Sequence, residues 1–147
     1  MKLIPKDDFL LLDTKIQISL QDISIPFGIE KYYNDYICKF SLNKENFILF
    51  NNIENQIREK LIEINEEYEL KSQINEFKNF KSLTCKLFKV KNNILTQILG
   101  ENSNIISHTD IKKKNKVNLI IFFDKLWIKD NIVYYKWKIY FIKKCRS

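Results

Sequence analysis

The last third of the chain carries the strongest structural signal, two runs of branched and aromatic residues separated by a short polar turn. The first run spans residues 116–128 and the second spans residues 132–143, with Lys129-Asp130-Asn131 between them. Branched and aromatic side chains favour strands, and a short polar segment between two such runs is typical of a hairpin. The pattern predicts an antiparallel β-hairpin and a chain organised around a sheet.

The return strand of this hairpin divides into two faces, because side chains alternate along a strand. The face predicted to be core carries Val133, Tyr135, Trp137, Ile139 and Phe141. The opposite face mixes rings with positive charge and carries Tyr134, Lys136, Lys138, Tyr140 and Ile142. Packing in the core is accordingly the favoured role for Trp137, whereas Trp127 on the outgoing strand is left open.

Further elements follow from periodicity and turn residues. Alternation predicts strands at residues 14–20, 36–42 and 83–90, with a weaker strand at 94–99 and an exposed loop at 101–116. Residues 25–29 contain Pro26 and Gly28 and predict a turn. Residues 45–67 repeat apolar side chains every three or four positions, which predicts one long amphipathic helix capped by Asn43. Its apolar face is Phe47, Phe50, Ile53, Ile57, Leu61, Ile64 and Tyr68, and its solvated faces carry Glu54, Arg58, Glu59 and Glu63.

Length and composition bound the class of protein. The 147 residues are enough for one domain, and 45% apolar and 14% aromatic residues predict that the chain folds. Neither a membrane-spanning run nor a signal-peptide core is present, which predicts an intracellular, soluble protein without membrane contact. Cys38, Cys85 and Cys145 form no C-x-x-C pair, so we expect free thiols, no metal and no cofactor. The absence of a phosphate loop or a recognisable catalytic arrangement argues against an enzyme.

Charge is distributed unevenly along the chain. Residues 1–73 carry nine Lys/Arg against thirteen Asp/Glu, whereas residues 74–147 carry sixteen against five. The net charges of −4 and +11 add to the overall +7. The chain has no alanine and far more Lys than Arg, a composition that AT-rich coding also produces, but coding drift spreads charge evenly. The asymmetry therefore suggests a polyanionic partner for the second half.

Binding a single nucleic-acid strand without sequence preference requires cations for the phosphates and aromatic faces on which bases stack. The outer hairpin face supplies both, and a second strand offers a smaller version of the same pattern. The candidate binding residues are Tyr134, Lys136, Lys138, Tyr140, Trp127, Lys86, Phe88, Lys112, Lys113, Lys114 and Lys116. For each of them solvation or packing is the alternative role. The scarcity of Arg predicts weak base readout and strong salt dependence.

The order of several motifs resembles one family. Pro26-Phe27-Gly28-Ile29, residues 36–43, a long amphipathic helix and the aromatic hairpin resemble the single-stranded DNA-binding proteins of large DNA viruses, which are similar to the phage T7-type protein. The resemblance covers residues 25–43 and 116–142, about half of the chain, and implies an OB-fold barrel. The wider group often ends in an acidic, aromatic-tipped tail, whereas residues 141–147 here are basic, so the function of that tail is not carried over.

These observations predict an α+β, mainly β chain, with residues 1–147 as a single OB-like nucleic-acid-binding domain. Its barrel would have five to six antiparallel strands and one long amphipathic helix. The predicted function is sequence-independent binding of single-stranded DNA, with RNA as an alternative strand, in replication, recombination or repair. A homo-oligomer or a replication-protein partner is compatible with this role. The alternative is a small interaction subunit of a viral assembly, in which another protein covers the aromatic hairpin.

Overall fold

The computed structural model describes residues 1–146, and of Phe77 it describes the backbone alone. Ser147, the last residue of the predicted domain, lies outside the described residues. The helices are α1 (Lys44–Ile64) and a short 3-10 helix, η1 (His108–Asp110). The strands are β1 (Leu3–Pro5), β2 (Phe9–Leu12), β3 (Gln17–Ile25), β4 (Ile29–Tyr32), β5 (Asp35–Ser41), β6 (Glu69–Leu70), β7 (Ile74–Phe77), β8 (Phe80–Leu87), β9 (Lys89–Val90), β10 (Asn93–Ile94), β11 (Gln97–Leu99), β12 (Asn115–Lys129) and β13 (Ile132–Lys144).

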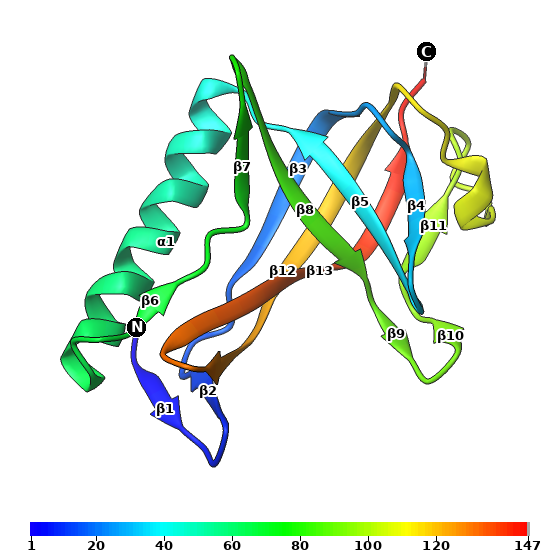
Figure 1. The fold of residues 1–147 in the computed structure, drawn as a ribbon. Coiled ribbons are helices and arrows are strands. Elements are labelled where there is room, and N and C mark those ends of the chain that lie inside the picture. The colour runs from blue at the N-terminus through cyan, green and yellow to red at the C-terminus, as the bar shows by residue number, and fades with distance from the viewer. Residues whose placement is uncertain (147) are drawn as a thin grey trace.

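The hairpin of β12 and β13 lies at the centre of the main sheet, as Figure 1 shows. Strand β12 pairs with β3 along one stretch and with β2 near the hairpin turn. On its other side β13 runs parallel to β8, and β5 and β4 continue the sheet from there. Each strand predicted from alternation is present, and the weaker one predicted at residues 94–99 is divided into the short β10 and β11. The predicted central hairpin is confirmed.

The sheet differs from the predicted barrel of five to six strands. Eleven strands join one open sheet in the order β1-β2-β12-β13-β8-β5-β4, with β3, β6, β7 and β11 branching from this path. Most of the additional strands are only two to four residues long. They complete the hydrogen bonding of the long central strands, whose edges would otherwise be unpaired. The class, mainly β with one long helix, is as predicted.

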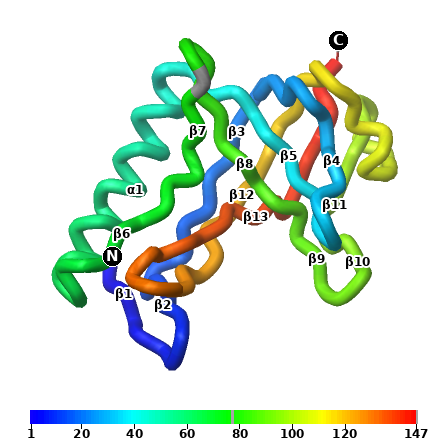
Figure 2. Tube along the Cα trace, in the orientation of Figure 1, coloured from blue at the N-terminus to red at the C-terminus, as the bar shows by residue number. Residues whose placement is uncertain are grey.

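Helix α1 packs against the inner side of the hairpin. Its N-cap is Asn43, whose Oδ1 accepts a hydrogen bond from the backbone amide of Asn46 at 2.8 Å, as predicted. The ring of Phe50 meets Trp137 edge to face, with 5.3 Å between ring centroids, and Trp137 is fully buried. The tube in Figure 2 shows the helix alongside β6 and β7, at the opposite end of the molecule from the C-terminus. The prediction that Trp137 belongs to the core is confirmed.

A β-bulge in β13 changes which side chains face the core. Ile121 pairs with Ile139 and Ile120 pairs with Phe141, so Tyr140 is an extra residue in its strand. The alternation therefore shifts by one position, and Ile142 is fully buried while Phe141 is half-buried. The prediction that Phe141 shares the core face with Trp137 while Ile142 lies opposite is wrong. The bulge leaves Tyr140 38% exposed.

The turn predicted at residues 25–29 joins β3 to β4. The amide of Gly28 donates to the carbonyl of Ile25 at 3.3 Å, and Gly28 has a φ of +66°, which L side chains rarely adopt. A Cβ at this position would also lie 3.0 Å from the carbonyl oxygen of Ile111. The turn is therefore fixed both by its backbone geometry and by the close approach of the loop before β12. Among the described residues, no helix is long and apolar enough to cross a membrane.

Candidate nucleic-acid interface

The outer face of the hairpin lies opposite the face against which α1 packs, and most of the outer side chains are half-buried, whereas Tyr140 is exposed. Tyr135 and Trp137 point inward, so the residues between and beside them in β13 point outward. Register places Lys86 of β8 beside Lys138, and Phe122 of β12 on its other side. We call this surface the ring-lysine face and define it by Lys86, Phe88, Phe122, Trp127, Tyr134, Lys136, Lys138 and Tyr140.

Three rings form a cluster at one end of this face. Phe122 and Tyr140 are stacked, with 3.9 Å between centroids and 19° between planes, and Phe88 meets both edge to face. The ammonium group of Lys138 lies 5.7 Å from the centroid of Phe88. The bulge at Tyr140 turns its ring onto Phe122, a residue that the sequence did not single out. Three rings and a cation are thus held together at this end of the face.

A second pair of rings lies nearer the hairpin turn. Trp127 and Tyr134 are direct cross-strand neighbours, and their rings are stacked at 6.2 Å with 20° between planes. Both side chains are half-buried, so each ring retains an exposed surface. Tyr134 and Tyr140 are six residues apart in β13, about 20 Å at the usual rise of a strand. The two ring groups therefore flank the lysines between them.

Each of these lysines has a polar partner. Lys138 pairs with Asp124 at 2.9 Å, and Lys86 pairs with Asp35 at 3.0 Å. Lys136 donates to Oε1 of Gln73 at 3.2 Å. Burial, followed by the charge of Lys86, lowers the pKa of Lys136. Two of the three lysines therefore have a carboxylate partner and the third has an amide oxygen.

Two small cavities open beside the lysines. One of about 150 Å³ is lined by Tyr32, Asp35, Ile37, Thr84, Cys85, Lys86 and Lys136. The other, of about 220 Å³, is lined by Lys15, Ile16, Gln17, Phe122, Phe123 and Tyr140. Each combines a tyrosine ring and aliphatic carbon with at least one lysine. The face thus has hollows as well as rings.

The lysine run before β12 lies away from the ring-lysine face. Lys112, Lys113 and Lys114 are exposed and follow the short helix η1, next to the turn at Gly28. Lys116 is six residues from Phe122 in the same strand, about 20 Å, and pairs with Asp22 at 3.8 Å. Of the eleven predicted binding residues, the structure brings seven onto the ring-lysine face and leaves these four at the far end of the hairpin.

A buried carboxylate lies beneath the interface. Glu54 of α1 is 1% exposed and accepts hydrogen bonds from the hydroxyl of Tyr135 at 2.5 Å and from the backbone amide of Gln73 at 2.9 Å. Ser72 and Arg58 donate to its other oxygen, at 2.6 and 3.4 Å. The prediction that Glu54 lies on a solvated helix face is therefore wrong. Gln73 connects this network to the interface, because its side chain binds Lys136.

Two of the three cysteines pack inside the sheet, behind this surface. Cys38 and Cys85 are buried and face each other across β5 and β8. Burial raises the pKa of Cys38 to about 12 and raises the pKa of Cys85 as well, so both thiols stay protonated near neutral pH. In the part of the chain that the structure describes, no group of three or more His, Cys, Asp or Glu could hold a metal ion.

The solved structures similar to this chain include three of a protein from one phage. The single-stranded DNA-binding protein from bacteriophage Enc34 aligns with 14% identity and a TM-score of 0.59 over 100% of this chain and 91% of that chain. Its C-terminal truncation and its complex with single-stranded DNA each align with 10% identity over 99% of this chain and 96% of that chain, with TM-scores of 0.58 and 0.57.

The chain has the fold of these phage single-stranded DNA-binding proteins. The resemblance to viral single-stranded DNA-binding proteins is thereby confirmed at the level of the fold. No protein-family model matches the sequence. No curated protein sequence matches it either. This chain and the phage protein therefore share a backbone fold at a sequence identity of only 10–14%.

Proposed function

We propose that residues 1–147 form one OB-like domain that binds single-stranded DNA across the ring-lysine face. The observation that carries this proposal is the placement of two ring groups and three lysines on one partly exposed face of the central hairpin and β8. The similar phage protein whose structure holds single-stranded DNA supports the nature of the ligand. The role is non-enzymatic and belongs to DNA replication, recombination or repair.

Binding follows from two kinds of contact. Lys86, Lys136 and Lys138 neutralise phosphates and release counterions, so affinity falls with salt, with a slope of about −0.7 per phosphate on a log–log plot. Bases stack on the exposed surfaces of the rings, and each stack contributes about 1–3 kcal/mol. Neither contact identifies a base, because lysine acts as a point charge and every base offers a π-face. The proposal therefore includes weak sequence preference.

Tryptophan fluorescence tests the binding directly. Trp127 lies on the ring-lysine face, whereas Trp137 is fully buried. Adding oligo-dT at low salt is expected to quench the emission, and added salt is expected to restore it. Trp127→Phe identifies the source, since it should remove the change while the signal of Trp137 remains. If neither fluorescence nor a gel shift responds at low salt, the proposal fails and an interaction subunit with a protein-covered hairpin is the better description.

The first mutational prediction concerns Tyr134 and Tyr140, one tyrosine from each ring group. Tyr134→Ala combined with Tyr140→Ala should weaken oligo-dT binding by about 1–3 kcal/mol for each stack removed, while the slope of affinity against salt stays unchanged. Phe80→Ala serves as the control, because Phe80 is a 40% exposed ring at the start of β8, six residues or about 20 Å from Lys86 along the strand. Unchanged affinity in a folded double variant removes these tyrosines from the site.

A further inference from the structure

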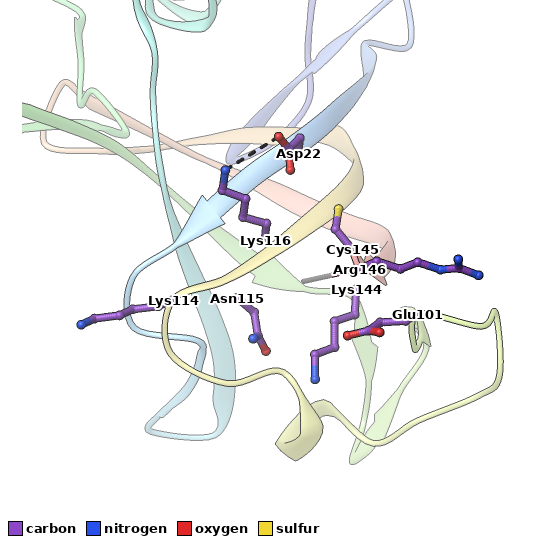
Figure 3. A pocket seen from close by; sticks show the side chains of 8 residues that line it. All are labelled: Asp22, Glu101, Lys114, Asn115, Lys116, Lys144, Cys145 and Arg146. Carbon is purple, nitrogen blue, oxygen red and sulfur yellow. Dashed lines mark ion pairs between the residues drawn. The ribbon is translucent and has the colours of Figure 1, made fainter.

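A second cationic site lies at the end of the hairpin far from its turn. A pocket of about 500 Å³ is present there, and Figure 3 shows its side chains. We call it the end pocket and define it by Asp22, Glu101, Lys114, Asn115, Lys116, Lys144, Cys145 and Arg146. Its four cations come from the start of β12 and the end of β13. Two of them, Lys144 and Arg146, were not among the residues predicted to bind nucleic acid.

The backbone that carries these cations is fixed by hydrogen bonds. The amide of Lys114 donates to the carbonyl of Ile25 at 2.9 Å, and the amide of Cys145 donates to the carbonyl of Lys116 at 2.9 Å. Asn115 accepts at Oδ1 from the amide of Lys112 at 2.7 Å. The lysine run is therefore not a loosely solvated loop at its C-terminal end. The backbone that carries these lysines is held in place, which reduces the part of the entropic cost of binding that comes from ordering the loop.

The charges in the end pocket are only partly neutralised from within. Lys116 pairs with Asp22 at 3.8 Å, and both side chains are largely exposed, so this contact is weak. Within residues 1–146, no carboxylate lies within ion-pair distance of Lys114, Lys144 or Arg146. Glu101 lines the pocket without forming such a pair. The charged groups of these three cations point in different directions around the pocket, as Figure 3 shows, so each is available to a different phosphate of an extended strand.

The end pocket is reached from the ring-lysine face along β12. Lys116 lies on the same side of β12 as Phe122, six residues away, a separation of about 20 Å at the usual rise of a strand. Lys144 pairs with the buried Val117 and therefore enters the pocket from the other side of the hairpin. In a nucleic-acid strand, phosphates about 3.4 Å apart along the axis cover the distance from Phe122 to Lys116 within a few nucleotides. The pocket has cations but no aromatic side chain among its lining residues, so its chemistry suits phosphates and not bases. Its position suits a strand already held by the rings.

We propose that the end pocket binds backbone phosphates of the nucleotides that extend past the ring-lysine face. This inference rests on the proposed function, because it assigns a second segment of the same bound strand. It implies that the binding site has two parts. A short oligonucleotide fills the stacking part alone, and a longer one reaches the end pocket and gains affinity that is strongly salt-dependent.

Cys145 provides a probe at the pocket itself. It is partly exposed and donates to Oδ1 of Asn118 at 3.4 Å, whereas Cys38 and Cys85 are fully buried. Burial raises the pKa of Cys145, so alkylation by a maleimide is best followed in mildly alkaline buffer. We expect an oligo-dT of about 16 nucleotides to slow this alkylation several-fold, and one of about 6 nucleotides to leave it unchanged; both lengths lie within the range of OB-fold sites.

Charge reversal tests the same assignment independently. Lys114→Glu with Lys144→Glu should weaken binding of the longer oligonucleotide several-fold and reduce its salt slope by about 0.7 for each phosphate that the variant no longer neutralises. Binding of the shorter one, read from Trp127 fluorescence, should be nearly unchanged. Lys6→Glu with Lys44→Glu is the matched control, because it changes the net charge equally at exposed positions that do not line the pocket. The control should bind both lengths like the unaltered chain.

The outcomes separate the two proposals. Failure of the short oligonucleotide to change the fluorescence of Trp127 removes the proposed function and this inference with it. If the short one binds but the long one gains no affinity and leaves Cys145 equally reactive, the inference alone is overturned. Inorganic triphosphate that protects Cys145 as well as the long oligonucleotide does would also overturn it, since the pocket would then be a site for small phosphates.

Discussion

At the scale of single residues, Glu54 is a buried carboxylate whose burial a local sequence pattern does not predict. In the helical repeat it falls among charged neighbours, and alternation of apolar side chains gives no reason to bury it. Its partners Ser72, Gln73 and Tyr135 are 18, 19 and 81 residues away in the chain, so a local pattern does not contain them. A buried carboxylate is stable only where several donors surround it, and these segments supply them.

Removing this acceptor should therefore be costly. Glu54→Gln replaces one carboxylate oxygen by a donor that faces the existing donors, and we expect a loss of about 1–3 kcal/mol in the free energy of unfolding. Tyr135→Phe should cost about 1.5–3 kcal/mol, the usual contribution of a hydrogen bond to a charged group. Urea denaturation measures both. Glu59→Gln, on an exposed part of the same helix, should stay within about 0.5 kcal/mol; equal effects at both glutamates would contradict the buried network.

Asp124 is the residue that competes most directly with DNA for a lysine. It pairs with Lys138 at 2.9 Å on the ring-lysine face. Asp124→Asn should free Lys138 for a phosphate and tighten oligo-dT binding by about 0.2–1 kcal/mol, the usual strength of an exposed pair. Asp130→Asn, in the hairpin turn, makes the same change in net charge and should have a smaller effect. Titrations that show the same tightening in both variants would indicate long-range charge alone.

At the scale of elements, alternation predicted the long strands and failed where the backbone departs from regularity. The core positions Val133, Tyr135, Trp137 and Ile139 follow from a period of two, but the bulge at Tyr140 reverses the remaining part of β13. A second bulge, where Asp22 has a φ of +53°, keeps Leu20 and Ile23 both buried. Bulges depend on how two strands match each other, which the sequence of one strand does not encode.

The beginning of α1 was predicted from one residue, and its contribution can be measured. Asn43→Ala removes the side-chain acceptor for the amide of Asn46 and should lower the free energy of unfolding by about 1 kcal/mol. Asn52→Ala is the control, because Asn52 is exposed within the same helix, where alanine is the better helix former. Thermal or urea unfolding followed by circular dichroism compares the two. An Asn43→Ala variant at least as stable as the control would contradict the cap.

At the scale of the whole molecule, the fold places an acidic helix and a basic surface on opposite faces of the hairpin. The acidic helix α1 packs on the inner side of the hairpin, and the ring-lysine face lies on the outer side of the same strands. The sequence predicted a polyanion-binding second half from its +11 charge, but not that Asp35 and Asp124 would pair with two of its lysines. Nor did it predict the short flanking strands, which are too short for a period to be visible. Charge position, not total charge, distinguishes the two faces.

Because lysines are abundant, chemical labelling of lysine can test which face of the molecule binds DNA. The chain has twenty-three lysines, so acetylation read by mass spectrometry reports on most of its surface. If lysines were enriched by coding drift alone, oligo-dT would protect them evenly. We expect protection of Lys86, Lys136 and Lys138, and unchanged labelling of Lys44 and Lys60 on α1. High salt should abolish the protection, because it displaces the phosphates that cause it. Labelling that falls on α1 but not on the ring-lysine face would place the DNA on the wrong side of the hairpin for every contact argued above.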